Sequence, residues 1–119
     1  MKTKVLKKNY EFRKVFEKKN YYAGKYLEIF ILKNGQNENF LGLAISKKIA
    51  NSVQRNRIKR FIREAYREIE NQVKQGYNIV ILWKKNVPIE KANYANIVSD
   101  LQNVICRANL NKEVWLWNI

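Results

Sequence analysis

The side chains best suited to chemistry in this sequence are cationic, and most of them lie in one stretch. Residues 46–67 carry 8 Lys or Arg side chains against a single Glu, a net charge of +7. A guanidinium group can make two parallel hydrogen bonds to a phosphate and can stack on a nucleobase. Asn56, between Arg55 and Arg57, adds an amide that both donates and accepts. The stretch therefore favours binding of a polyanion.

Residues that commonly catalyse bond cleavage are missing or scattered. The sequence has no histidine, which excludes imidazole acid–base catalysis and histidine-ligated metal sites. Its 10 acidic residues are spread along the chain, whereas RNA-cleaving proteins usually need histidines or a carboxylate cluster that holds metal ions. Cys106 is the only cysteine, which excludes an intrachain disulfide and suits a reducing cytoplasm. We expect no catalytic residues and no dedicated metal site on this chain.

The formal net charge of +14 is concentrated in two segments. Besides residues 46–67, residues 1–19 carry 8 cations and 2 acids, whereas residues 20–45 are neutral overall and residues 68–119 sum to +1. Such a charge opposes compact folding by self-repulsion, so it favours a polyanionic partner over a generic basic protein. No apolar run approaches the roughly 18 residues of a membrane span, and the basic N-terminus lacks the apolar core of a secretion signal.

Apolar spacing predicts the elements before the basic stretch. A short helix is expected over residues 9–18, with Asn9 as its cap and Phe12, Val15 and Phe16 on one face. Strands are expected over residues 25–32 and 40–45, joined as a hairpin through the Asn34–Gly35 turn. A further short strand over residues 21–24 is weakly marked.

The basic stretch itself is predicted to be helical from Asn51 or Ser52 to about Val73, with Gly76 as a stop. The inward stripe comprises Ile58, Phe61, Ile62, Ala65, Tyr66, Ile69 and Val73. The opposite face carries Asn56, Arg60, Arg63 and Arg67, with Arg57 and Lys59 on its flanks. One face is therefore core and the other a row of cations, although a solvated basic face without any partner remains an alternative.

Three cations near the start of this helix lie outside its polar face. Arg55 falls towards the apolar side of an ideal helical wheel, but it lies close enough to the helix start for its side chain to reach around that end. Lys47 and Lys48 precede the helix, whose N-terminal amides also favour a phosphate.

The remaining sequence completes a single α+β domain over residues 1–119. The apolar run 77–83 predicts a strand buried on both faces, and a final helix is expected over residues 90–108, just after Pro88. The order helix, strand, strand, helix, strand, helix predicts a two-layer α+β sandwich. The apolar tail Trp115–Trp117 is expected to pack onto the domain, with a membrane or partner contact as the alternative.

These residues resemble the signature of the bacterial ribonuclease P protein subunit. The matching positions are Ser46-Lys47-Lys48, Asn51, Val53, the run Arg55-Asn56-Arg57-Ile58-Lys59-Arg60, and Ile62-Arg63. The opening Leu6-Lys7-Lys8, Phe12 and Val15-Phe16 also match, so the resemblance covers nearly the whole chain. Ala50 departs from the glycine that is frequent in the family, which restricts the loop before the helix but removes no functional group.

The resemblance implies a fold, an activity and partners. The family fold resembles domains of ribosomal proteins and contains a left-handed strand–helix–strand crossover, against the usual preference. Its members bind ribonuclease P RNA and the 5′ leader of precursor tRNA, while the RNA subunit performs the Mg²⁺-dependent endonucleolytic cleavage. A cytoplasmic monomer in a 1:1 complex with RNA is implied, with no membrane or DNA partner.

The resemblance also assigns residues. Those expected to bind the RNA subunit are Arg55, Asn56, Arg57, Lys59, Arg60, Arg63 and Arg67. Those expected to line the leader cleft are Phe12, Phe16, Phe30, Lys47 and Lys48. The three phenylalanines suit a hydrophobic core equally well on sequence grounds. Three other functions stay open at this point: a ribosome-associated protein of similar fold, a dimeric helix-based DNA-binding regulator, and a stand-alone nuclease.

Overall fold

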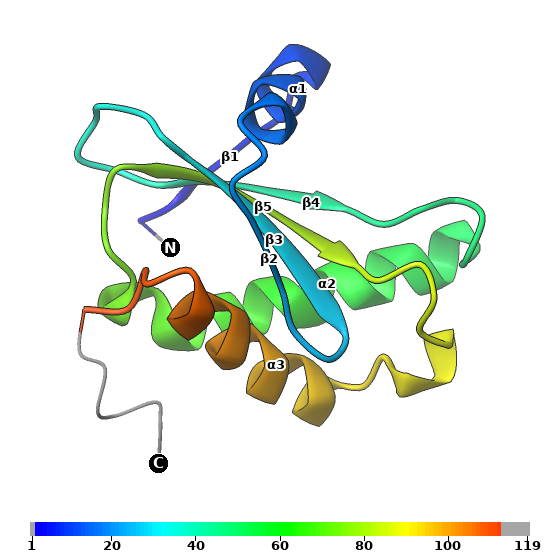
Figure 1. Cartoon of the computed structure of the whole chain (residues 1–119). Coiled ribbons are helices and arrows are strands. Elements are labelled where there is room, and N and C mark those ends of the chain that lie inside the picture. Colours follow the sequence, from blue (N-terminus) through cyan, green and yellow to red (C-terminus); the bar gives the residue numbers. More distant parts are fainter. Residues whose placement is uncertain (1, 113–119) are drawn as a thin grey trace.

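The computed structural model describes residues 2–112, which form a five-stranded mixed sheet with helices on both faces (Figure 1). In chain order the elements are β1 (Lys4–Val5), α1 (Asn9–Glu17), β2 (Tyr21–Ala23), β3 (Leu27–Lys33), β4 (Phe40–Ala44), α2 (Ser52–Ile69), β5 (Tyr77–Trp83) and α3 (Tyr94–Arg107), with 3₁₀ turns at Glu70–Gln72 and Ile89–Lys91. The predicted packing of the Trp115–Trp117 tail concerns residues outside this range.

Strand β5 is the centre of the sheet, whose strand order is β1-β4-β5-β3-β2. It pairs in parallel with β4, where Leu41 lies opposite Ile79, and antiparallel with β3, where Ile31 lies opposite Ile79. Ile79, Val80 and Ile81 have no exposed surface. The prediction of a strand buried on both faces is confirmed.

The predicted hairpin between the strands at 25–32 and 40–45 is wrong, because β5 lies between β3 and β4. The most apolar strand is buried best in the central position, so the Asn34–Gly35 connection passes the end of β5 instead of closing a tight hairpin. The weakly marked strand at 21–24 is confirmed as β2, which pairs antiparallel with β3 through Tyr21 and Phe30.

The predicted α+β sandwich is confirmed. Helices α2 and α3 pack on one face of the sheet and form its larger core, whereas α1 lies on the opposite face as a partial third layer (Figure 1). Val15 of α1 is fully buried beside Val80 of β5. The parallel neighbours β4 and β5 are joined through α2, as the resemblance implies; the handedness of that crossover stays a prediction.

Helix ends follow local hydrogen bonding more closely than apolar spacing does. The Asn51 Oδ1 atom accepts the Gln54 N–H at 2.8 Å while Gln54 Oε1 accepts the Asn51 N–H at 3.0 Å, which fixes the start of α2. The prediction of Asn9 as a cap is wrong. Lys8 occupies the cap position of α1, and its N–H is accepted by Glu11 Oε1 at 3.0 Å.

The last helix begins four residues later than residue 90, its predicted start. The residues after Pro88 form the 3₁₀ turn Ile89–Lys91, and α3 begins at Tyr94. The Asn93 side chain caps it by accepting the Asn96 N–H at 2.9 Å.

A buried carboxylate joins α3 to the turn between β2 and β3. Asp100 is 4% exposed and accepts the backbone N–H groups of Lys25, Tyr26 and Leu27 at 2.8, 2.8 and 2.7 Å. A Cβ at Gly24 would lie 2.5 Å from its Oδ1 atom, so glycine is what lets the carboxylate approach. This contact orients β3 over α3.

We predict that Asp100→Asn lowers the free energy of unfolding by about 3 kcal/mol, because an amide offers one acceptor oxygen where three N–H groups converge. Urea unfolding followed by circular dichroism measures it, with Ser99→Ala on the exposed side of α3 as control. Equal midpoints for the two variants would contradict a structural role for the carboxylate.

Glu70 anchors the N-terminal strand. Its carboxylate accepts the N–H of Thr3 at 2.7 Å and that of Lys2 at 3.1 Å. Burial alone would raise the pKa of Glu70, but these hydrogen bonds, and Thr3 above all, outweigh burial and lower the pKa below its ordinary value of 4.5. A lowered folded-state pKa contributes stability above the unfolded value, and that stability is lost as the pH falls through the folded value.

We therefore expect acidification below about pH 4.5 to destabilise the wild-type chain more than Glu70→Gln, which has no carboxylate to titrate. Urea unfolding at pH 7 and pH 3 gives the comparison, with the exposed Glu64→Gln as control. A stability difference between wild type and Glu70→Gln that stays the same at both pH values would show that Glu70 titrates normally.

Candidate nucleic-acid interface

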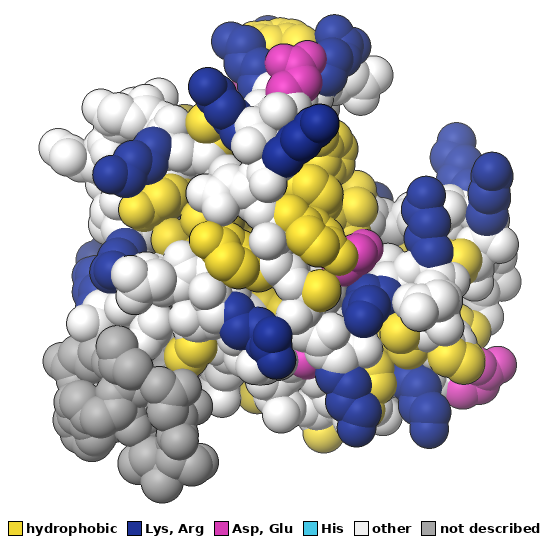
Figure 2. All heavy atoms as spheres, viewed as in Figure 1, with side chains coloured by type: hydrophobic (Ala, Val, Ile, Leu, Met, Phe, Trp, Pro, Cys, Tyr) yellow, Lys and Arg dark blue, Asp and Glu magenta, His cyan; other side chains and the backbone are white. Residues whose placement is uncertain are grey.

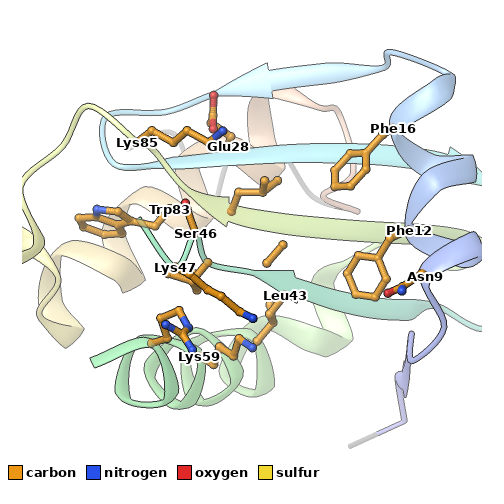
Figure 3. A pocket seen from close by; sticks show the side chains of 14 residues that line it. Asn9, Phe12, Phe16, Glu28, Leu43, Ser46, Lys47, Lys59, Trp83 and Lys85 are labelled. Atoms are coloured by element: carbon orange, nitrogen blue, oxygen red, sulfur yellow. The ribbon is translucent and has the colours of Figure 1, made fainter. Parts of the chain in front are cut away.

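A hollow of about 670 Å³ lies beside α1, over the part of the sheet that this helix leaves open. Phe12 and Phe16 form its α1 side, and Leu43 and Leu82 belong to the strands below. Figure 3 shows the two rings on one side of the hollow and Lys47 and Lys59 across the strands from them. We call this hollow the cleft.

The aromatic side of the cleft depends on a glycine in β4. A Cβ at Gly42 would lie 2.6 Å from a ring carbon of Phe12, so the ring lies directly against the strand. Phe16 meets Phe30 edge-on with ring centroids 4.9 Å apart, and Tyr21 lies 5.0 Å from Phe30 on its other side. The geometry holds the rings in fixed positions.

The three predicted phenylalanines are core residues and cleft residues at once. Phe12, Phe16 and Phe30 are half-buried and pack against the buried Val15 and Val80. Phe12 and Phe16 line the cleft, and Phe30 lines an adjoining hollow of about 390 Å³ together with Phe16. Each ring is therefore partly packed in the core and partly accessible from a hollow.

The cationic side of the cleft includes two residues that we assigned to a different surface. Arg55 and Lys59 both line it, together with Lys47, whereas the exposed Lys48 lies next to it without lining it. Arg55 is half-buried, and its Nη1 atom donates to the carbonyl of Ala50 at 2.9 Å. This bond fixes the Arg55 side chain at the helix start, as its place on the wheel suggested.

Sequence reasoning missed Lys85, which lines the cleft from the exposed loop after β5. The Lys84–Lys85 pair directly after a predicted buried strand was the signal that could have identified it. Glu28 is the acidic residue among those lining the cleft, and it accepts a hydrogen bond from the Tyr21 hydroxyl at 2.6 Å. That hydrogen bond, burial and the charge of Glu28 raise the pKa of Tyr21.

Helix α2 separates its two faces as predicted. The buried residues are Ile58, Ile62, Ala65, Tyr66 and Ile69, and the exposed polar residues include Asn56, Arg57, Arg60, Arg63 and Arg67, besides Ser52, Glu64 and Glu68. We call Asn56 and the four exposed arginines the arginine face. The ion pair within 4.0 Å among residues 2–112 is Lys4–Glu38, so no carboxylate of the described chain forms an ion pair with these arginines.

Phe61 lies at the boundary of the two faces and is half-buried, although the pattern predicted it in the core stripe. The guanidinium carbons of Arg57 and Arg60 lie 5.8 and 5.6 Å from the centre of its ring. Tyr94 of α3 packs against the same ring at 6.0 Å and donates a hydrogen bond to Glu68 at 2.7 Å. An aromatic pair thus supports two arginines on the surface.

The face of the molecule around α1 combines both features of a nucleic-acid interface. Figure 2 shows apolar side chains gathered beneath α1, with Lys and Arg side chains around them.

Among residues 2–112, no three His, Cys, Asp or Glu side chains gather in a way that could hold a metal ion. None of the helices described has the length and apolar character needed to cross a bilayer.

A family model and the similar proteins of known name all point to one family. A family model described as Ribonuclease P matches residues 1–109. The chain is 38% identical over 111 residues to the ribonuclease P protein component of Clostridioides difficile, covering 92% of this chain and 96% of that protein. It is 42% identical over 105 residues to the corresponding protein of Alkaliphilus oremlandii, covering 88% and 90%.

Solved structures of RNase P proteins also match this chain. The RNase P protein of Staphylococcus aureus matches with a TM-score of 0.81 at 26% identity, over 92% of this chain and 99% of that one. The RNase P protein of Thermotoga maritima matches with a TM-score of 0.78 at 23% identity, over 87% and 96%; at that identity the likeness concerns the fold alone.

Proposed function

This chain belongs to the ribonuclease P protein family, and we propose that it holds RNA at two surfaces while the RNA subunit cuts. As the protein component of ribonuclease P, its partner is ribonuclease P RNA. The arginine face of α2 binds that RNA, and the cleft beside α1 binds the single-stranded 5′ leader of precursor tRNA. The complex is a 1:1 assembly of a protein monomer and RNA, at work in the cytoplasm.

The observation that carries the proposal is the one-sided charge of α2. Its arginines are exposed along one face, Arg57 and Arg60 are supported by Phe61, and no described carboxylate lies within 4.0 Å of them. Guanidinium groups in this state bind phosphates and release the counterions condensed on RNA. Asn56 adds a donor and an acceptor on the same face.

The cleft suits a single strand better than a duplex. Bases stack on accessible aromatic side chains with about 1–3 kcal/mol each, and the half-buried Phe16 and Phe30 line the hollows beside α1. Lys47, Arg55 and Lys59 line the far side and would bind the phosphates. We propose Phe12 and the neighbouring Lys48 and Lys85 as further leader contacts.

The same proposal assigns the chemistry to the RNA subunit. That subunit uses Mg²⁺ to hydrolyse the phosphodiester bond and release the leader. The protein contributes cations that offset repulsion between leader and catalytic RNA, and aromatic side chains that hold the leader in place. This division of labour is supported by a sequence without histidine and by scattered carboxylates.

A double substitution tests the arginine face. Arg57→Ala with Arg60→Ala should weaken binding to ribonuclease P RNA and flatten the plot of log affinity against log salt by about 0.7–0.9 for each phosphate that the variant no longer neutralises. Filter binding across a salt series measures both quantities. As a control, Lys91→Ala with Lys112→Ala removes the same charge from exposed positions outside α2. Equal losses of affinity for the two pairs would show that only the net charge matters and would contradict a binding role for the arginine face.

Reconstitution tests the function as a whole. At low Mg²⁺, adding the protein to a bacterial ribonuclease P RNA should raise the rate of precursor-tRNA cleavage, because protein cations then replace part of the metal's screening. The protein should also strengthen binding of precursor tRNA more than binding of mature tRNA, which lacks the leader. The proposed function fails if cleavage is unchanged by the protein, and the leader role fails if both tRNAs respond alike.

A further inference from the structure

The cleft does not end at Phe12 but continues over the edge of the sheet. A second hollow, of about 240 Å³, shares Phe12, Leu43 and Lys59 with the cleft. Its remaining walls are Val5, Leu6, Lys7, Leu41 and Arg63, contributed by β1 and the segment after it, by β4 and by α2. We call this second hollow the edge site.

The edge site exists because β1 is only two residues long and pairs with β4 only at Phe40 and Leu41. The Lys4 N–H is accepted by the Asn39 carbonyl at 2.9 Å, and the Leu6 N–H by the Leu41 carbonyl at 3.0 Å. Backbone groups of alternate residues in a strand point to the same side.

Leu43 is the next residue of β4 in that series. There the chain after β1 has already turned away into α1, so among the described residues no strand lies opposite the outward N–H and C=O groups of Leu43. An open strand edge offers a ready donor and acceptor to a ligand.

The chemistry of the edge site matches one nucleotide. Its walls are apolar at Phe12, Leu43 and Val5, and Val5 is 50% exposed although it is a large hydrophobic residue. Its cations are Lys7, Lys59 and Arg63, and no acidic residue lines it. A volume of 240 Å³ corresponds to about eight water molecules, comparable with the non-hydrogen atoms of one nucleobase.

We propose that the edge site binds one nucleotide of the 5′ leader, adjacent to the nucleotides held in the cleft. Its base lies between Phe12 and Val5, accepts a hydrogen bond from the open N–H of Leu43 and donates one to the Leu43 carbonyl, while Lys59 and Arg63 bind its phosphates. An extended peptide could also pair with a free strand edge, but three cations without an acid favour a polyanion. The inference rests on the proposed leader binding.

One consequence concerns how the two RNA surfaces are related. Lys59 lines both the cleft and the edge site, and Arg63 belongs to both the edge site and the arginine face. A leader that crosses the edge of β4 would therefore lie against α2, beside the RNA bound to the arginine face. The two surfaces form one continuous path around the edge of the sheet.

Photocrosslinking in the assembled holoenzyme tests this placement. Cys106 is the only cysteine, so Cys106→Ser gives a background for single cysteines that carry an azidophenacyl group. Val5→Cys places the probe in the edge site, Lys85→Cys in the cleft, and Ala95→Cys on an exposed part of α3 as control. Catalytic RNA and a precursor tRNA with a labelled leader complete the assembly.

The probes at positions 85 and 5 should crosslink to different but neighbouring leader nucleotides, and the probe at position 95 to none. If the probe at 85 reaches the leader while that at 5 reaches only catalytic RNA or nothing, the edge site is overturned and the cleft proposal stands. If neither probe reaches the leader, the proposed leader binding itself fails, and the edge site with it.

Measuring the affinity for precursor tRNA is a second test of the edge site. Val5→Glu places a carboxylate beside the phosphates of the bound nucleotide and should weaken precursor-tRNA binding by the holoenzyme about tenfold, with mature tRNA unaffected. Ala95→Glu makes the same change of charge on α3. Val5→Thr keeps the β-branched shape of the side chain without adding charge, so it controls for altered packing of β1. Equal losses for Val5→Glu and Ala95→Glu would contradict the site.

Discussion

The central strand β5 has to bury both of its faces, and among residues 2–112 the one helix that covers the second face, α1, is only nine residues long. On the α2–α3 side, Ile79 and Ile81 belong to a large continuous core. On the other side, Val80 is completely buried in a cluster with Val15 of α1 and Leu6, but Leu82 at the end of the same strand stays only half-buried. The cleft is the part of the sheet face that α1 is too short to cover, so an incomplete core layer and the proposed leader-binding surface are the same feature.

Helix α2 is subject to the opposite constraint, because it must bury one face fully while it keeps the other charged. Ile58 and Ile62 are buried in the core, so the arginines between and beyond them have to point outwards. The capping pair of Asn51 and Gln54 then fixes where the helix starts, and with it the position of Arg55 at the mouth of the cleft. Concentrated positive charge opposes compact folding, and a bound polyanion offsets this repulsion and stabilises the folded state by mass action.

Features governed by local periodicity were predictable from the sequence, whereas features decided by competition between distant segments were not. The boundaries of β5 and the two faces of α2 follow from apolar spacing within one element. The hairpin prediction failed because two adjacent strands in sequence, β3 and β4, each pair better with the distant and more apolar β5. Strand β1 is too short for any periodic signal. The place of Arg55 in the cleft depends on a hydrogen bond to the Ala50 carbonyl, which a helical wheel cannot represent.

Polar contacts, not apolar ones, set the length of β1 and thereby the edge of the sheet. Asn39 is fully buried: its carbonyl accepts the Lys4 N–H, and its side chain donates to the Lys74 carbonyl and accepts the Tyr77 N–H, both at 2.9 Å. Together with Glu70, it holds the start of β1 in place, and within residues 2–112 the last backbone hydrogen bond from this segment to β4 is the one from the Leu6 N–H to the Leu41 carbonyl. A longer β1 would pair with Leu43 and close the edge. The short strand therefore leaves open the route from the cleft to α2, and in the proposed arrangement this route lets one RNA strand contact both surfaces of a small protein.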